Sequence, residues 1–238
     1  MTDSVSIIIP ARNEQEYLPA CLESVWQAAR LAGIEPEVIV VINRSNDRTE
    51  EIAKQAGCRI VREDARNLAR IRNVGLRAAE GNLLITVDAD SIVAENMFTE
   101  ILKIMNTDRY VGGGVLILPE RWSLGILLSG VMLLPIVLCY RIAGGLFFFT
   151  REGFEATGGF SEDLVSAEDI DFARRLKAYG KSINKKYKIL LRSYIITSCR
   201  KFDRLGDWYF IKNIGTTIKL LRGREQELAN KIWYDFKR

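Results

Sequence analysis

The sequence predicts an α/β fold in which a mainly parallel central sheet carries helices on both faces. Over the first ninety residues, short apolar segments rich in β-branched residues alternate with segments of helical periodicity. The apolar segments are hydrophobic almost throughout, which is typical of parallel strands buried on both faces. Right-handed connections join such strands into a Rossmann-like half. Because ligands in such sheets bind beyond the carboxyl ends of the strands, the loops that follow the strands are the candidate site.

The first half divides into four strands and three helices. The strands are expected at residues 5–9, 37–42, 59–62 and 83–87. The first helix begins near Pro19 and ends near Gly33, with Leu18, Leu22 and Val25 on its apolar face. The others are expected at 48–56 and 70–79, followed by Gly57 and Gly81. The polar loops 10–14, 43–47 and 88–90 then converge on one crevice.

The second half is less regular. Strands are expected from Gly112 to residue 118 and at 145–150, a turn at 158–160, and a helix at 167–179 stopped by Gly180. We expect one domain over 1–238. It comprises a nucleotide-sugar-binding half at 1–93, an acceptor-side and catalytic-base half at 94–204, and a helical tail at 205–238.

Composition narrows the function. The chain has 238 residues, 48% hydrophobic, with a net charge of +4 and no histidine. This charge is mild, so no nucleic-acid partner is expected. The cysteines at 21, 58, 139 and 199 form no CxxC pair, which indicates free thiols in a reducing compartment. The N-terminus lacks a secretory pattern, so we expect a cytoplasmic protein.

Residues 123–140 are uncharged and flanked by Arg121 and Arg141. Eighteen such residues reach the lower edge of a membrane span, although Gly125, Gly130 and Pro135 interrupt them. Three interpretations are open: a buried or surface-packed helix, a peripheral contact with the inner face of the membrane, and a true span. A span is incompatible with one site built from both acidic clusters described below.

Asp88-Ala89-Asp90 follows the fourth apolar strand. Without histidine, a metal site must be built mainly from carboxylates, which select hard ions such as Mg²⁺ or Mn²⁺. Strand alternation predicts that Asp88 and Asp90 face the same side, where a cation would relieve their repulsion. The alternative is a turn in which Asp90 and Ser91 cap a helix that begins near Ala94.

The second acidic cluster is Glu168 and Asp169. One of these carboxylates is the expected general base for a hydroxyl nucleophile, because no histidine is available. The alternative is a capping box formed by Ser166 and Asp169 at a helix start. Asp171 and Arg175 have the spacing of an ion pair on one helix face.

Arginines near the acidic clusters could bind phosphate. Arg66 and Arg70 either do so or lie on a solvated helix face. Arg200 and Lys201 either close over a diphosphate or belong to a charged loop.

Three blocks in order resemble glycosyltransferase family 2, whose members are inverting enzymes of the GT-A fold. The first is Ile7-Ile8-Ile9-Pro10-Ala11-Arg12-Asn13-Glu14. The second runs from Arg72-Asn73-Val74-Gly75 to Asp88-Ala89-Asp90. The third is Gly158-Gly159-Phe160 with Glu168, Asp169 and Arg175. Together the blocks cover roughly residues 4 to 180.

The resemblance implies a nucleoside-diphosphate sugar donor, an Mn²⁺ or Mg²⁺ cofactor, and direct displacement with inversion. It implies that Asp169 is the catalytic base, that Asp90 binds the metal and that Asp88 contacts the nucleoside. Pro10, Arg12 and Glu14 would border the base and ribose pocket, and Arg72 would approach it. The candidate site also includes Glu168, Asn43, Ala89 and Arg200.

The chain departs from the family pattern at two places. Asn43 replaces an acid that often meets the nucleobase, so the base preference could differ from uracil. The late histidine that many relatives supply to the metal is absent, and the cations of residues 197–202 are expected to replace part of its charge. The acceptor is left open between a saccharide and a lipid-linked molecule. The rival functions are a nucleotidyltransferase and a sugar-nucleotide-binding module without catalysis.

Overall fold

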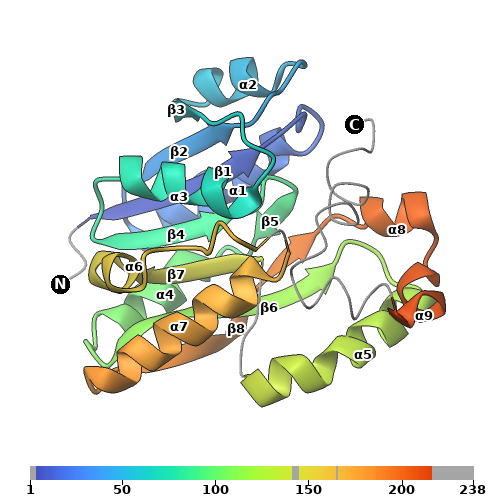
Figure 1. Cartoon of the computed structure of the whole chain (residues 1–238). Coiled ribbons are helices and arrows are strands. Elements are labelled where there is room, and N and C mark those ends of the chain that lie inside the picture. Colours follow the sequence, from blue (N-terminus) through green and yellow to red (C-terminus); the bar gives the residue numbers. More distant parts are fainter. Residues whose placement is uncertain (1–3, 141–144, 165, 216–238) are drawn as a thin grey trace.

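The structure is a computed structural model that describes residues 4–140, 145–164 and 166–215 (Figure 1). Its centre is an eight-stranded sheet with the strand order β3-β2-β1-β4-β7-β6-β8-β5. The strands are β1 (Val5–Ala11), β2 (Glu37–Ile42), β3 (Arg59–Arg62), β4 (Leu83–Val87), β5 (Ser91–Val93), β6 (Tyr110–Pro119), β7 (Leu146–Thr150) and β8 (Lys186–Thr197). The helices are α1 (Leu18–Ala32), α2 (Thr49–Gln55), α3 (Leu68–Ala78), α4 (Met97–Met105), α5 (Leu124–Tyr140), α6 (Arg151–Thr157), α7 (Glu168–Ser182), α8 (Arg200–Leu205) and α9 (Tyr209–Lys212).

The first four strands are parallel, and β7 then runs antiparallel between β4 and β6. β8 is parallel to β6, and β5 pairs antiparallel with β8. The predicted mainly parallel α/β fold is confirmed. The carboxyl ends of β1, β2 and β4 lie at one edge of the sheet, which brings their loops together.

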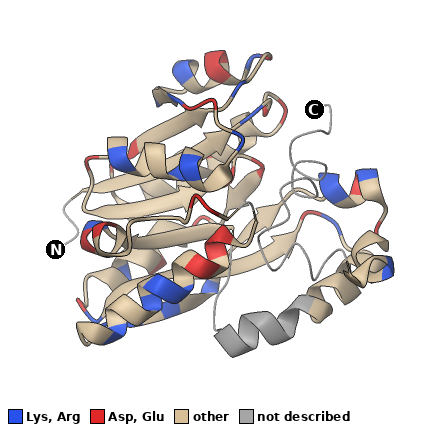
Figure 2. Cartoon of the chain, viewed as in Figure 1, with Lys and Arg blue, Asp and Glu red and all other residues tan. Residues whose placement is uncertain are grey.

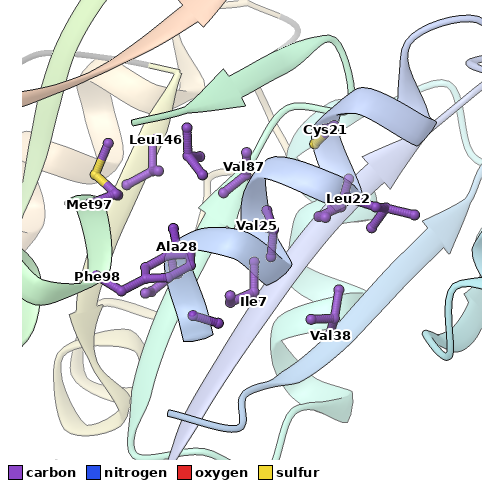
Figure 3. Packing of buried hydrophobic residues seen from close by; sticks show 14 of the residues in the cluster. Ile7, Cys21, Leu22, Val25, Ala28, Val38, Val87, Met97, Phe98 and Leu146 are labelled. Atoms are coloured by element: carbon purple, nitrogen blue, oxygen red, sulfur yellow. The ribbon is translucent and has the colours of Figure 1, made fainter. Parts of the chain in front are cut away.

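Helices cover both faces of the sheet because the strand residues alternate between two apolar cores. Ile7 and Ile9 point to the core under α1, α2 and α4, whereas Ile8 points to the core under α3, α6 and α7. In Figure 3, Leu22 and Val25 of α1 pack toward the strands in the first of these cores. These opposed cores hold the strand ends in place.

The first half follows the prediction closely, and three of its four strands have the predicted bounds. α3 begins two residues earlier than expected, because the side chain of Asn67 caps it by accepting a hydrogen bond from the backbone N–H of Arg70 (2.9 Å).

The structure also contains elements that the sequence pattern did not predict: β5 at the end of the first half, and α6, β8 and α8 beyond it. The proposed cap formed by Asp90 and Ser91 is wrong, because Ser91 starts β5 and α4 begins only at Met97. The expected stop of α7 at Gly180 is also wrong. Gly180 is a point of close approach instead, since a Cβ there would lie 2.7 Å from the side chain of Val111 in β6.

α5 lies apart from the sheet and packs against the α9 region (Figure 1). Its outer residues are exposed, so of the buried or surface-packed helix that was expected, α5 is the surface-packed form. Within the described ranges, no helix combines the length and the apolar character needed to cross a bilayer. Of the predicted tail, residues 216–238 lie outside the described residues.

Candidate active site

The three polar loops at the strand ends are tied together by hydrogen bonds. The backbone N–H of Asn13 donates to the Ser45 hydroxyl (3.0 Å), and the Asn13 side chain accepts from the backbone N–H of Asn46 (2.9 Å). The backbone N–H of Glu14 donates to the Thr49 hydroxyl (2.7 Å). The loop after β1 and the loop after β2 therefore form one wall.

A pocket of about 290 Å³ opens between this wall, the turn after β4, the start of α7 and the start of α8. Every residue of the predicted site lines it: Pro10, Arg12, Glu14, Asn43, Arg72, Asp88, Ala89, Asp90, Glu168, Asp169 and Arg200. The pocket is also lined by residues that the sequence did not single out or left open, which are Ala11, Leu68, Ile71, Ser166, Ala167 and Lys201. Arg66 and Arg70 do not line it, and Arg70 pairs instead with Glu63 on the surface (3.1 Å).

Arg72 joins the two acidic clusters. Its guanidinium is buried and donates to Asp88 Oδ1 and to Glu168 Oε1, each at 2.8 Å. It also lies over the ring of Phe160, with 5.3 Å to the centroid. Residues separated by about 80 positions in the sequence are thereby fixed in one ion-pair network.

Asn73, the next residue on α3, holds the turn that precedes α7. Its buried side chain accepts from the backbone N–H of Phe160 (2.9 Å) and donates to the backbone carbonyl of Phe160 (2.8 Å). Arg175 holds the same turn from α7, because it donates to the carbonyls of Thr157 and Gly159. It also pairs with Asp171 (2.7 Å), as the spacing predicted. Asn73 follows Arg72 in the second family-like block, but its spacing did not predict this positioning role.

Glu168 and Asp169 form the acidic first turn of α7 (Figure 2). Burial raises the pKa of both carboxyl groups, and the nearby Arg72 guanidinium partly opposes this effect. The N-cap position is Ala167, in the left-handed conformation (φ 57°), with no side-chain cap, so the predicted capping box is wrong. The Asp169 carboxylate instead accepts from the backbone N–H of Ile170 (2.7 Å) and lines the pocket.

Asp90 and Asp88 occupy a turn rather than the strand itself, and they face different partners. Asp90 accepts a hydrogen bond from the Ser198 hydroxyl (3.0 Å) and pairs with Arg200 (2.9 Å). Arg200 also binds both carboxylate oxygens of the buried Glu14, at 2.6 and 2.9 Å. Its guanidinium lies 5.2 Å from the centroid of the Tyr17 ring. Arg200, a single cation, thus pairs with two of the pocket carboxylates.

The structure explains why position 43 carries an amide. The Asn43 side-chain nitrogen donates to the backbone carbonyls of Glu63 (2.5 Å) and Ala65 (2.9 Å). A carboxylate could not make these bonds. The other atom, Oδ1, is buried without a partner among the described residues.

Few side chains of the pocket are suited to bind a divalent cation. Among the described residues, no cluster of three or more histidine, cysteine, aspartate or glutamate side chains is arranged to hold a metal ion. Asp88 pairs with Arg72 and Asp90 pairs with Arg200, so a divalent cation at Asp90 would have to share that carboxylate with Arg200. One carboxylate fits Mg²⁺-like ions only if substrate phosphates and waters complete the shell, which is how such ions usually bind.

The carboxylate- and arginine-lined pocket lies at the carboxyl ends of the strands, where open α/β sheets bind their ligands. Residues 6–126 match the family model for glycosyl transferase family 2. The chain belongs to this family of glycosyltransferase enzymes.

Individual relatives match over shorter or more divergent stretches. The chain is 35% identical over 97 residues to the undecaprenyl-phosphate 4-deoxy-4-formamido-L-arabinose transferase of Pseudomonas fluorescens, covering 36% of this chain and 27% of that one. In this match and in those to three other curated relatives, the chain spans no more than 30% of the relative's length.

Two solved structures share the fold. Staphylococcus aureus TarS 1–349 in complex with UDP-GlcNAc has a TM-score of 0.65 at 17% identity, over 98% of this chain and 71% of that one. The mannosyltransferase PcManGT of Pyrobaculum calidifontis, in complex with GDP-Man and Mn²⁺, has a TM-score of 0.65 at 19% identity, over 94% and 69%. At these identities the likeness establishes the GT-A fold.

Proposed function

We propose that this chain transfers a sugar from a nucleoside-diphosphate sugar to an acceptor hydroxyl with inversion at the anomeric carbon. The observation that carries the proposal is the meeting of Asp88, Asp90 and Asp169, from two distant segments, in one pocket. The sugar nucleotides in the TarS and PcManGT structures support the same donor class here.

The nucleoside lies in the wall formed by the loops after β1 and β2, which belong to the proposed nucleotide-sugar-binding half at 1–93. Pro10, Arg12 and Asp88 border it, and Asn43 Oδ1 accepts a hydrogen bond from the base. Because the amide nitrogen is engaged elsewhere, Asn43 presents an acceptor, as a carboxylate would. This favours a base with an N–H donor on its edge, such as uracil or guanine.

Asp169 is the general base in this proposal. It lines the pocket, and its raised pKa makes it a better proton acceptor than an ordinary aspartate. Glu168 and Arg72 hold the first turn of α7 against Asp88, and so position Asp169. Asp169 takes the proton of the acceptor hydroxyl as the oxygen attacks the anomeric carbon.

A divalent cation, Mn²⁺ or Mg²⁺, would be held by Asp90 together with the donor diphosphate. When bound, it neutralises charge on the leaving diphosphate. Arg200 and Lys201 line the same side of the pocket and add positive charge there. Such prearranged charge is usually the largest contribution to catalysis in a closed site.

We further propose a lipid-linked acceptor in preference to a free saccharide, and a cytoplasmic location at the inner face of the membrane. The undecaprenyl-phosphate transferase among the relatives supports the acceptor class. The described cysteines Cys21, Cys58 and Cys199 are buried free thiols, which fits a reducing compartment.

The proposal is tested by Asp169→Asn, with Asp163→Asn as control because Asp163 is exposed and does not line the pocket. Release of nucleoside diphosphate from a bound donor should fall about 10²- to 10⁴-fold in Asp169→Asn, the usual worth of acid–base catalysis, while donor affinity is kept. The wild-type rate should rise with pH as Asp169 loses its proton, with an apparent pKa above the ordinary value of about 3.9. Near-normal turnover in Asp169→Asn would reject Asp169 as the base.

A further inference from the structure

We propose that the outer face of α5 docks on an anionic phospholipid bilayer. Only the purpose of this docking, which is to bring the pocket to a lipid-linked acceptor, rests on the proposed function. The docking itself involves residues outside the pocket.

The docking face is a stripe of large apolar side chains, Leu124, Leu127, Leu128 and Val131. They are 62%, 47%, 39% and 53% exposed, respectively. Their spacing of i, i+3, i+4 and i+7 places them on one face of the helix. The stripe is therefore a continuous apolar surface in contact with solvent.

The opposite face of α5 is the one that packs against the protein. Gly125, Ile126 and Ser129 are buried there, and a Cβ at Gly125 would lie 2.6 Å from the backbone carbonyl of Asp207. Surface helices normally turn charged residues outward, but the sequence has no Asp, Glu, Lys or Arg between Arg121 and Arg141. A helix that is apolar on its exposed face marks an interaction surface.

The surroundings of the stripe favour lipid over a second copy of this chain. Trp122 precedes it and is 63% exposed, and Trp208, beside α9, is 41% exposed. Tryptophan is enriched where a protein meets the membrane–water boundary. The neighbouring helices carry the exposed cations Arg204 and Lys212 (Figure 2).

The acidic residues of this region pair with a cation other than Arg204 and Lys212. Asp203 and Asp207 both accept from Arg121, at 2.5 and 2.7 Å. Arg200 is engaged in the pocket by Glu14 and Asp90. The other charged residues of segments 120–132 and 199–215 are four cations, Arg121, Lys201, Arg204 and Lys212, and three acids, Glu120, Asp203 and Asp207. The excess of one positive charge beside an apolar stripe suits anionic headgroups.

The helix that carries the stripe is linked to the pocket through α9 and α8. α8 supplies Arg200 and Lys201 to the pocket, and the adjoining α9 packs on α5. A bilayer in contact with α5 would thus lie next to the α8 side of the pocket.

The test is flotation of the full chain with two kinds of vesicle, without donor or acceptor. One is phosphatidylcholine alone, and the other contains about one-third phosphatidylglycerol. The wild type should float with the anionic vesicles, and the double variant Leu124→Glu/Leu127→Glu should lose about tenfold or more in partitioning. Leu31→Glu is the matched control, because Leu31 is 60% exposed on α1 and outside the stripe. It should float like the wild type.

Thermal unfolding of each variant shows that the fold is intact. Two results would overturn the proposal: absence of wild-type binding to anionic vesicles, and equal loss in Leu31→Glu. A wild-type dimer in solution that becomes monomeric in the double variant, without vesicle binding, would assign the stripe to a second copy instead. Since donor binding plays no part in this assay, its failure would leave the proposed transfer reaction standing.

Discussion

Replacement of Arg72 by methionine perturbs the contact that holds the two acidic clusters together. The guanidinium is 5% exposed and bridges Glu168, which is 9% exposed, to Asp88, which is 35% exposed. Removing one member of a buried ion pair leaves the partner charged and unpaired, at a cost of about 3–5 kcal/mol in unfolding free energy. Asp88 can recover water, so most of the loss comes from Glu168.

The loss of unfolding free energy in Arg72→Met should depend on pH. Burial already raises the pKa of Glu168 and Arg72 opposes this, so the pKa rises further without the arginine. A carboxyl group whose folded pKa lies above its unfolded pKa binds more protons in the folded state, so its contribution to stability is lost as pH rises through the folded pKa. Arg72→Met should therefore be more destabilising at pH 8 than at pH 5.

Urea unfolding at these two pH values measures both effects. The double variant Arg72→Met/Glu168→Gln removes the unpaired charge and should recover part of the stability lost at pH 8. Arg70→Met, on the exposed face of the same helix, is the control and should change the unfolding curve little. The reasoning is refuted if Arg72→Met behaves like Arg70→Met, or if its cost does not change with pH.

Two further variants test other contacts of the site. Asn73→Ala removes both hydrogen bonds to the backbone of the buried Phe160, so it should lower the unfolding free energy by about 2–4 kcal/mol. It should also lower turnover, because α7 would be misplaced. Stability equal to the wild type in urea unfolding would contradict the positioning role. Arg200→Gln removes a unit charge beside Asp90. If a divalent ion at Asp90 lay about 5 Å from this charge, the charge would oppose binding by about 1.7 kcal/mol even in a water-like dielectric. Donor-free Mn²⁺ affinity should therefore rise about 17-fold, and an unchanged affinity by electron paramagnetic resonance would argue against a metal at Asp90.

β1, β2 and β4 were predictable because each is buried on both faces, which leaves an apolar segment with little ambiguity. β8 was not predictable. Its residues Lys186 and Lys188 are exposed, and an irregularity in its pairing with β6 between Val115 and Leu116 breaks the alternation of buried and exposed positions. β5 has only three residues and owes its existence to pairing with β8, a partner about 100 residues away.

The composition of the pocket was predictable because strand order and motif spacing bring the three loops together. The ion-pair and hydrogen-bond partners of the pocket residues were not predictable. The sequence suggested that Asp88 and Asp90 share a cation, whereas Asp88 pairs with Arg72 and Asp90 with Arg200. Asn43 looked like a change in base recognition, yet its amide nitrogen is required by two carbonyls of the neighbouring loop. Such pairings depend on long-range packing that no local pattern encodes.

The central claim is that the pocket lined by Asp88, Asp90 and Asp169 holds a sugar nucleotide, and donor binding tests it most directly. Thermal unfolding with Mn²⁺ should be followed against a panel of uridine, guanosine, adenosine, cytidine and thymidine diphosphate sugars. A donor at one hundred times its dissociation constant should stabilise the wild type by about 2.7 kcal/mol, or about 5–11 °C, and should fail to stabilise Asp88→Ala. A wild type that no sugar nucleotide stabilises, or an Asp88→Ala variant that responds equally, would contradict the account.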